Sequence, residues 1–230
     1  GVWYSNNGAP EMLLRNSLAT VRAAAAGSRH AVTVVTCPWR PVPGNPFPEV
    51  LADLDGRTGH AAIARQMRQC LDAAGPGFDA VAFLEHDVLY PPDHFDAVGD
   101  AFGFDPTATV VSNLNYEGLN ATGWLKVVER HEPMHQLAVR YDAAVDNLNR
   151  AIWDCAVQGW AYLEPDHGAD RSHWLQLPAD PDRPPAVHVN HTTGRLTSHG
   201  EVCFATDANG RTDHPFWGES RRWWPAPAAP

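Results

Sequence analysis

The chain has 230 residues, of which 44% are hydrophobic and 19% are charged, an ordinary composition for a globular protein with one core. Its net charge of −10 argues against strong non-specific binding to nucleic acid, because neutralising phosphates requires a basic surface. In such an acidic protein, a site for an anionic substrate needs a metal ion or clustered arginines. No run of about 18 apolar residues is present, so we expect no membrane span.

The four cysteines are scattered along the chain without any Cys-x-x-Cys pair. This spacing excludes a zinc-finger motif, and a chain of this size needs no disulfide framework. No secretory signal peptide is visible in the sequence. We therefore expect reduced thiols and a cytoplasmic location.

The first 90 residues alternate between strand and helix patterns. Val2–Tyr4 is a short strand that ends in a polar turn, and 31–36 is a β-branched strand followed by a loop with five prolines. Amphipathic helices are predicted over 10–26 and over 58–74, the second capped by Thr58. An apolar strand then leads to Glu85 and Asp87. This order predicts an α/β fold with a mostly parallel central sheet flanked by helices.

The second half of the chain has weaker signals. We predict a strand over 109–112 and further strands over 160–163 and 186–189. Apolar residues at helical spacing, from Leu137 through Tyr141 and Leu148 to Ile152, predict a third helix. Residues 223–230 form a Trp-, Pro- and Ala-rich tail that we expect to be extended or disordered.

Two carboxylates stand one residue apart where the third strand ends. Residues i and i+2 of a strand point to the same face, so Glu85 and Asp87 are predicted to face one ligand. Carboxylates at the end of a buried strand are costly without a cation. Oxygen ligands of this kind suit Mg²⁺ or Mn²⁺. The alternative is a strand end where two acids meet solvent.

A histidine-rich segment follows the strand over 186–189. If Val187 and Val189 face the core, His188 faces the other way, and His191 lies just past the strand. Either histidine is a candidate to complete a metal site that Asp87 begins. Arg195 is a candidate bidentate donor to a phosphate. The chain has twelve histidines, so the alternative is that both are ordinary surface or core residues.

Together these features resemble the GT-A class of nucleotide-sugar glycosyltransferases, and family-2-like members in particular. The resemblance rests on the β-α-β-α-β start, on Glu85-His86-Asp87 followed by Tyr90-Pro91-Pro92, and on a downstream histidine. It covers about the first 120 residues. It implies a single Rossmann-like GT-A domain over 1–222, in which 1–120 bind the nucleotide sugar and 121–222 complete the acceptor and metal sites.

The resemblance also implies an activity: metal-dependent transfer of a hexosyl group from a nucleotide sugar, such as a UDP-sugar, to a hydroxyl acceptor. Asp87 would bind Mn²⁺ or Mg²⁺, with His188 or His191 as second ligand. The cofactor-binding residues that it implies are Tyr4, Ser5 and Asn6 for the base, with Glu85 and Arg195. Since Glu85 replaces the usual first Asp, its contact with the metal, the ribose or neither stays open.

An inverting transferase also needs a base to deprotonate the acceptor. Glu164 and Asp166 are the candidates, with Asp170 as a competitor. Trp124 and Trp160 are candidates for an apolar wall beside a sugar ring, although aromatic side chains more often belong to the core.

Other functions use the same side chains. A metal-dependent hydrolase or a nucleotidyltransferase is an alternative enzyme. A nucleotidyltransferase should carry a Gly-rich or basic phosphate loop near the first strand, and the turn at 5–8 lacks Lys or Arg. A non-catalytic binder of nucleotide sugars is a third interpretation. The resemblance implies a glycan or a lipid-linked saccharide as the default acceptor. A hydroxylated DNA base is an alternative that the Arg- and Trp-rich segment 221–224 favours and the net charge disfavours.

Overall fold

The computed structural model describes residues 1–57, 59–120, 123–126, 134–158, 173–189, 191 and 212–223. Its main sheet has six strands in the order β2-β1-β3-β8-β5-β9. All of them run in one direction except β8, which is antiparallel to both of its neighbours. The strands are β1 (Val2–Ser5), β2 (Val35–Pro38), β3 (Ala80–Glu85), β5 (Val110–Asn113), β8 (Leu137–Arg140) and β9 (Trp174–Leu177).

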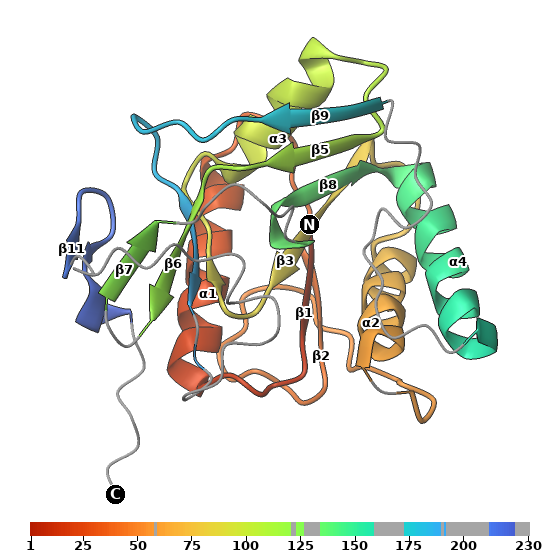
Figure 1. The fold of residues 1–230 in the computed structure, drawn as a ribbon. Helices are drawn as coiled ribbons and strands as arrows, with labels where there is room; N and C mark the ends of the chain where they lie inside the picture. The colour runs from red at the N-terminus through yellow and green to blue at the C-terminus, as the bar shows by residue number, and fades with distance from the viewer. Residues whose placement is uncertain are drawn as a thin grey trace, which may run out of the picture.

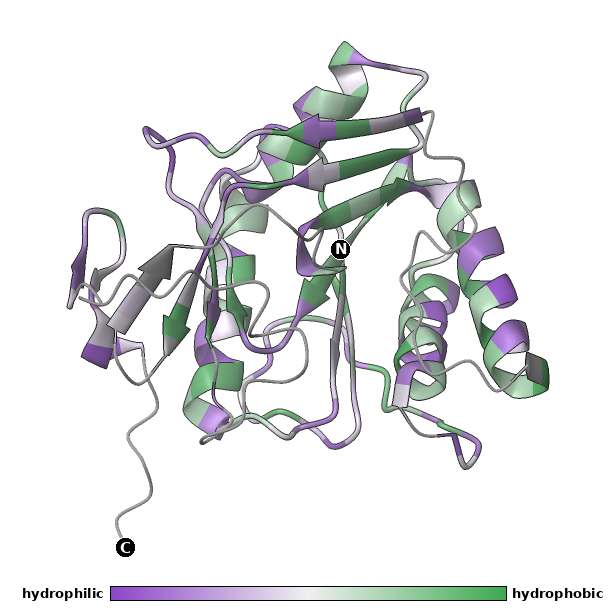
Figure 2. Cartoon of the chain, in the orientation of Figure 1, coloured by the Kyte–Doolittle hydropathy of each residue, from purple (hydrophilic) through white to green (hydrophobic). Residues whose placement is uncertain are grey.

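Helices cover both faces of this sheet (Figure 1). Alternation along β1 places Trp3 in one core with the apolar side chains of α1 and α3, and Val2 and Tyr4 in a second core with those of α2 and α4. Figure 2 shows hydrophobic residues concentrated on the sheet and hydrophilic ones on the outer sides of the helices. The helices are α1 (Glu11–Gly27), α2 (Gly59–Ala74), α3 (His94–Phe104) and α4 (Tyr141–Gln158). The predicted α/β fold with a mostly parallel, helix-flanked sheet is confirmed.

A second sheet of four strands has the order β4-β10-β6-β7, and a two-stranded hairpin follows it. The indole of Trp124 donates a hydrogen bond to Gly218 O at 3.1 Å, and that of Trp217 donates to Pro185 O at 2.9 Å. These bonds hold the hairpin against the second sheet. The remaining elements are β4 (Val88–Leu89), β6 (Tyr116–Asn120), β7 (Gly123–Lys126), β10 (Ala186–Val189), β11 (Asp213–His214), β12 (Gly218–Glu219), and the 3-10 helices η1 (Met134–Gln136) and η3 (Ser220–Arg222).

Two predicted boundaries are wrong. The second strand begins at Val35 rather than Ala31, because its pairing with β1 starts there and continues through Pro38. The third helix begins at Tyr141 rather than Leu137, since Leu137–Arg140 forms β8 between β3 and β5. In both places tertiary pairing overrides local propensity. The predicted cap Thr58 and the strand over 160–163 lie outside the described residues, as do residues 224–230 of the tail.

None of the helices in the described part of the chain is both long and apolar enough to cross a membrane.

Candidate functional site

The acidic motif lies in a turn at the carboxyl end of the main sheet. Glu85 is the last residue of β3, His86 and Asp87 form the turn, and β4 begins at Val88. The prediction that Glu85 and Asp87 share one face of a strand is therefore wrong, because the strand ends before Asp87. The turn instead separates the two carboxylates into neighbouring groups with different partners.

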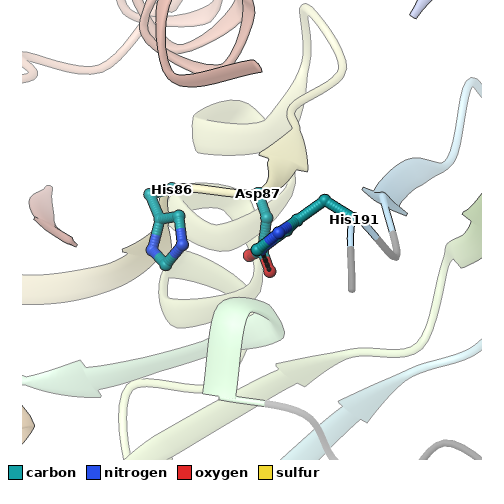
Figure 3. Close-up of side chains that lie close together, drawn as sticks. All are labelled: His86, Asp87 and His191. Atoms are coloured by element: carbon teal, nitrogen blue, oxygen red, sulfur yellow. Dashed lines mark ion pairs between the residues drawn. The ribbon is translucent and has the colours of Figure 1, made fainter. Parts of the chain in front are cut away.

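The first group surrounds Asp87. His188 Nε2 lies 3.3 Å and His191 Nε2 lies 3.5 Å from Asp87 Oδ2. Ligand atoms of His86, Asp87 and His191 all lie within 4.8 Å of one another, which makes these three a candidate metal site. Figure 3 shows the His86 and Asp87 side chains projecting to the same side of the turn, with the His191 ring against the carboxylate.

Backbone pairing brings the histidine-rich segment to this turn. Val189 N donates a hydrogen bond to Asp87 O at 2.8 Å, and β10 pairs antiparallel with β4 through His188 and Val88. Val187 and Val189 are fully buried, as the sequence predicts, so His188 points away from that core and toward Asp87. This pairing places His188 and His191 beside a residue about 100 positions earlier in the chain.

The charges of this group stabilise one another. Burial disfavours an ionised Asp87, but the positive charges of His188 and His86 and the hydrogen bonds of His188 and His191 outweigh it, so its pKa lies well below the ordinary value. Burial likewise opposes a charged His188, yet Asp87 and Glu85 together raise the pKa of His188 to about 8. An Asp87 carboxylate beside a His188 imidazolium is therefore the state at neutral pH.

The second group surrounds Glu85. Tyr4 Oη donates to Glu85 Oε1 at 2.7 Å, and His135 Nδ1 lies 3.3 Å from Glu85 Oε2. Burial opposes ionisation of Glu85, but the hydrogen bond and charge of His135 outweigh it and lower the pKa of the carboxyl group. Burial lowers the pKa of His135, and because an ionised Glu85 can only accept hydrogen bonds, Nδ1 is the donor to the carboxylate. Glu85 is thus fixed as a hydrogen-bond acceptor next to Asp87.

Hydrogen bonds with Tyr90 and with Ser17 of helix α1 hold the end of β3 in place. Glu85 N donates to Tyr90 Oη at 2.7 Å, and Ser17 Oγ donates to Glu85 O at 3.2 Å while accepting a bond from the Trp3 indole. Tyr90 N in turn donates to Thr20 Oγ1 on α1. Helix α1 is therefore hydrogen-bonded to the chain before the turn, at Glu85, and after it, at Tyr90.

The expected base-binding residues lie at the neighbouring edge formed by β1 and β2. Tyr4 and Ser5 are buried, and only Asn6 is exposed. Ser5 O accepts bonds from Trp39 N at 3.0 Å and from Gln66 Nε2 at 3.0 Å. This edge is well fixed in position, but only Asn6 of the three predicted residues presents an exposed side chain.

Some predicted site residues are placed elsewhere or fall outside the described part of the chain. Trp124 is 1% exposed and its indole is bonded to Gly218, so its predicted place in a sugar-binding wall is wrong. The predicted site residues that lie outside the described residues are Trp160, Glu164, Asp166, Asp170 and Arg195.

Sequence reasoning missed two histidines of the site. Alternation along a continuous strand would point His86 away from Glu85 and Asp87, so the sequence pattern alone does not bring it into the site. His135 lies on η1, immediately before β8, and nothing in its local pattern connects it with Glu85, 50 positions earlier. The one signal in the sequence is the pair His86-Asp87 itself. Both residue types bind metal ions, and a turn after the strand can point two neighbouring side chains to the same side.

The donor set decides what the first group can hold. Two imidazoles and one carboxylate are ligands for a divalent metal ion, and three protein ligands leave positions open for a substrate. The residues therefore fit a divalent metal ion with open coordination positions.

No known family model matches this chain, and no curated protein matches it in sequence. Solved structures do match. One is a glycosyltransferase involved in the glycosylation of the major capsid of PBCV-1, at 12% identity and a TM-score of 0.51 over 84% of this chain and 93% of that one. A 4-diphosphocytidyl-2C-methyl-D-erythritol synthase from Anaerococcus prevotii matches at 8% identity and a TM-score of 0.45, over 80% and 90%.

A 2-C-methyl-D-erythritol 4-phosphate cytidylyltransferase from Thermus thermophilus gives 9% identity and a TM-score of 0.44, over 80% of this chain and 91% of that one. Of these three structures, the PBCV-1 glycosyltransferase alone has a TM-score above 0.5, and at 12% identity it shows a common fold rather than a common activity. The chain shares its fold, a mostly parallel sheet flanked by helices, with the PBCV-1 glycosyltransferase.

Proposed function

We propose that this chain is a metal-dependent glycosyltransferase that moves a sugar from a nucleoside-diphosphate sugar to a hydroxyl acceptor. The observation that carries the proposal is the group His86, Asp87 and His191 at the carboxyl end of a mostly parallel sheet. Ligands of open α/β sheets bind at that end. The fold shared with a glycosyltransferase supports the same interpretation.

The chemistry follows from the charges. A nucleoside diphosphate is a poor leaving group until its negative charge is neutralised, and a divalent ion bound at Asp87 would supply that Lewis acidity. His188 lies 3.3 Å from the same carboxylate and would hold it in position for the ion. Glu85, held by Tyr4 and His135, is positioned to accept a hydrogen bond from a donor hydroxyl.

The transfer step needs a proton acceptor. The acceptor oxygen bonds to the anomeric carbon as the bond from that carbon to the diphosphate breaks, and the hydroxyl proton passes to a base. Glu164 and Asp166 stay our candidates for that base, and Arg195 stays our candidate for a diphosphate contact. Asn6, exposed at the end of β1, is the proposed contact to the nucleotide base. The assignment of 1–222 to one catalytic domain belongs to the same proposal.

The experiment is a donor panel. The chain is incubated with UDP-, GDP-, TDP- and CMP-sugars in Mn²⁺, Mg²⁺, Co²⁺ or EDTA, and free nucleotide is quantified. We expect slow release of a nucleoside diphosphate from one donor, lost in EDTA. Release of inorganic diphosphate from a nucleoside triphosphate and a sugar phosphate would instead establish a nucleotidyltransferase. Binding of nucleotide sugars without turnover, even with candidate acceptors, would establish a binding protein.

A further inference from the structure

The direction of the His86 ring depends on where β3 ends. If β3 continued through Asp87, the His86 ring would point to the opposite face of the sheet. Because the strand ends at Glu85, the turn brings the ring round to the Asp87 side (Figure 3). Its centroid lies 5.9 Å from that of the His191 ring, and both rings contribute a nitrogen to the group around Asp87.

The hydrogen bonding of His86 also indicates a missing partner. Its Nδ1 is buried and has no hydrogen-bond partner among the residues that the structure describes. Buried polar atoms in proteins are nearly always paired, so an unpaired ring nitrogen in a partly buried side chain calls for a ligand or a water. Two independent observations, its distance to Asp87 and His191 and its unpaired nitrogen, therefore concern the same ring.

We propose that His86 is a direct metal ligand and that it makes this site select a nitrogen-preferring transition metal ion, such as Co²⁺ or Zn²⁺, over Mg²⁺. Imidazole suits the later first-row ions, whereas Mg²⁺ prefers carboxylate, carbonyl and water oxygens. With His191 the site has two imidazoles to one carboxylate. His188, 3.3 Å from Asp87 Oδ2, orients that carboxylate as a partner outside the ligand set. The inference rests on the proposed function in one respect: it takes the metal ion to bind at His86, Asp87 and His191.

The test measures metal binding to the full chain after EDTA treatment. Co²⁺ is titrated and followed by its visible absorption, and Mg²⁺ is titrated as a competitor. The variant is His86→Gln, which keeps a polar side chain of similar size. Loss of a direct ligand should weaken Co²⁺ binding at least as much as loss of an outer-shell partner, roughly 10–100-fold. Mg²⁺ binding should change by less than about threefold, because Mg²⁺ gains little from imidazole.

His173→Gln is the matched control, because His173 is an exposed histidine outside the site, and it should bind Co²⁺ as the wild type does. Unchanged Co²⁺ binding in His86→Gln would overturn the inference. So would an equal loss of Co²⁺ and Mg²⁺ binding, which would mean that His86 only supports the local fold. Nucleotide release from the donor panel is measured separately. The inference on metal selectivity can therefore fail while the glycosyltransferase proposal holds, and the glycosyltransferase proposal can fail while the metal selectivity holds.

Discussion

Gln66 holds the edge of the sheet where the nucleotide is proposed to bind. It lies on α2, is 1% exposed, and its amide donates to Ser5 O at 3.0 Å and to Cys37 O at 2.7 Å. One side chain therefore ties together the ends of β1 and β2. We predict that Gln66→Leu, a change of similar volume, destabilises the fold and loosens this edge.

The magnitude follows from the two bonds. Each hydrogen bond contributes about 0.5–1.5 kcal/mol net, and a buried acceptor left unpaired costs about 1–3 kcal/mol. Ser5 O keeps its bond from Trp39 N and Cys37 lies on β2 paired with β1, so the expected loss is mainly that of the two amide bonds themselves. We expect a loss of about 2–3 kcal/mol in the free energy of unfolding.

The assay is urea unfolding followed by tryptophan fluorescence, with Gln69→Leu as the matched control. Gln69 lies on the same helix and its amide donates to Asp53 O at 2.8 Å, but it is only partly buried. Water can replace its lost bonds, so we expect Gln69→Leu to cost less than about 1 kcal/mol. Equal losses in the two variants, or a Gln66→Leu variant as stable as the wild type, would refute the reasoning.

Two further predictions concern buried polar groups. Burial, with a smaller contribution from His135, lowers the pKa of His94 to about 3, so the unfolded chain binds a proton there that the folded chain excludes as pH falls below 6.5. When the pH falls from 6.5 to 4.5, the free energy of unfolding of the wild type should therefore drop by about 2–3 kcal/mol more than that of His94→Leu. Urea unfolding of both proteins at both pH values measures this, and a difference between them that does not change with pH would contradict it. Tyr4→Phe should lose about 1–2 kcal/mol at pH 7, because Glu85 Oε1 loses a donor at 2.7 Å, and a neutral substitution would mean that this bond contributes nothing to stability.

The sequence was sufficient to predict most of the first half of the fold. Alternating apolar strands and amphipathic helices predicted β1, α1 and α2 close to their observed bounds, because each of these elements has its own period and end signals. The strand β10 was predicted from Ala186–Val189 for the same reason. Where the pairing partner decides the structure, as for Leu137 on β8, local patterns favoured the wrong element.

The site was predictable in part. Asp87, His188 and His191 lie together, and their role as metal ligands stays a prediction. What could not be predicted was the end of β3 at Glu85, which places His86 with Asp87 and pairs Glu85 with His135. Turn geometry and contacts across 50 to 100 residues depend on the assembled fold, and no short motif contains them.

The most direct test of the proposed site is nucleotide release from the active donor by Asp87→Asn, compared with Asp72→Asn. Asp72 is an exposed carboxylate on α2 that pairs with Arg68, so its variant controls for loss of a negative charge. We predict that Asp87→Asn loses roughly a hundredfold or more of the metal-dependent rate while Asp72→Asn keeps it, because the metal loses its carboxylate ligand. Full turnover by a folded Asp87→Asn variant would contradict the claim that the site is centred on Asp87.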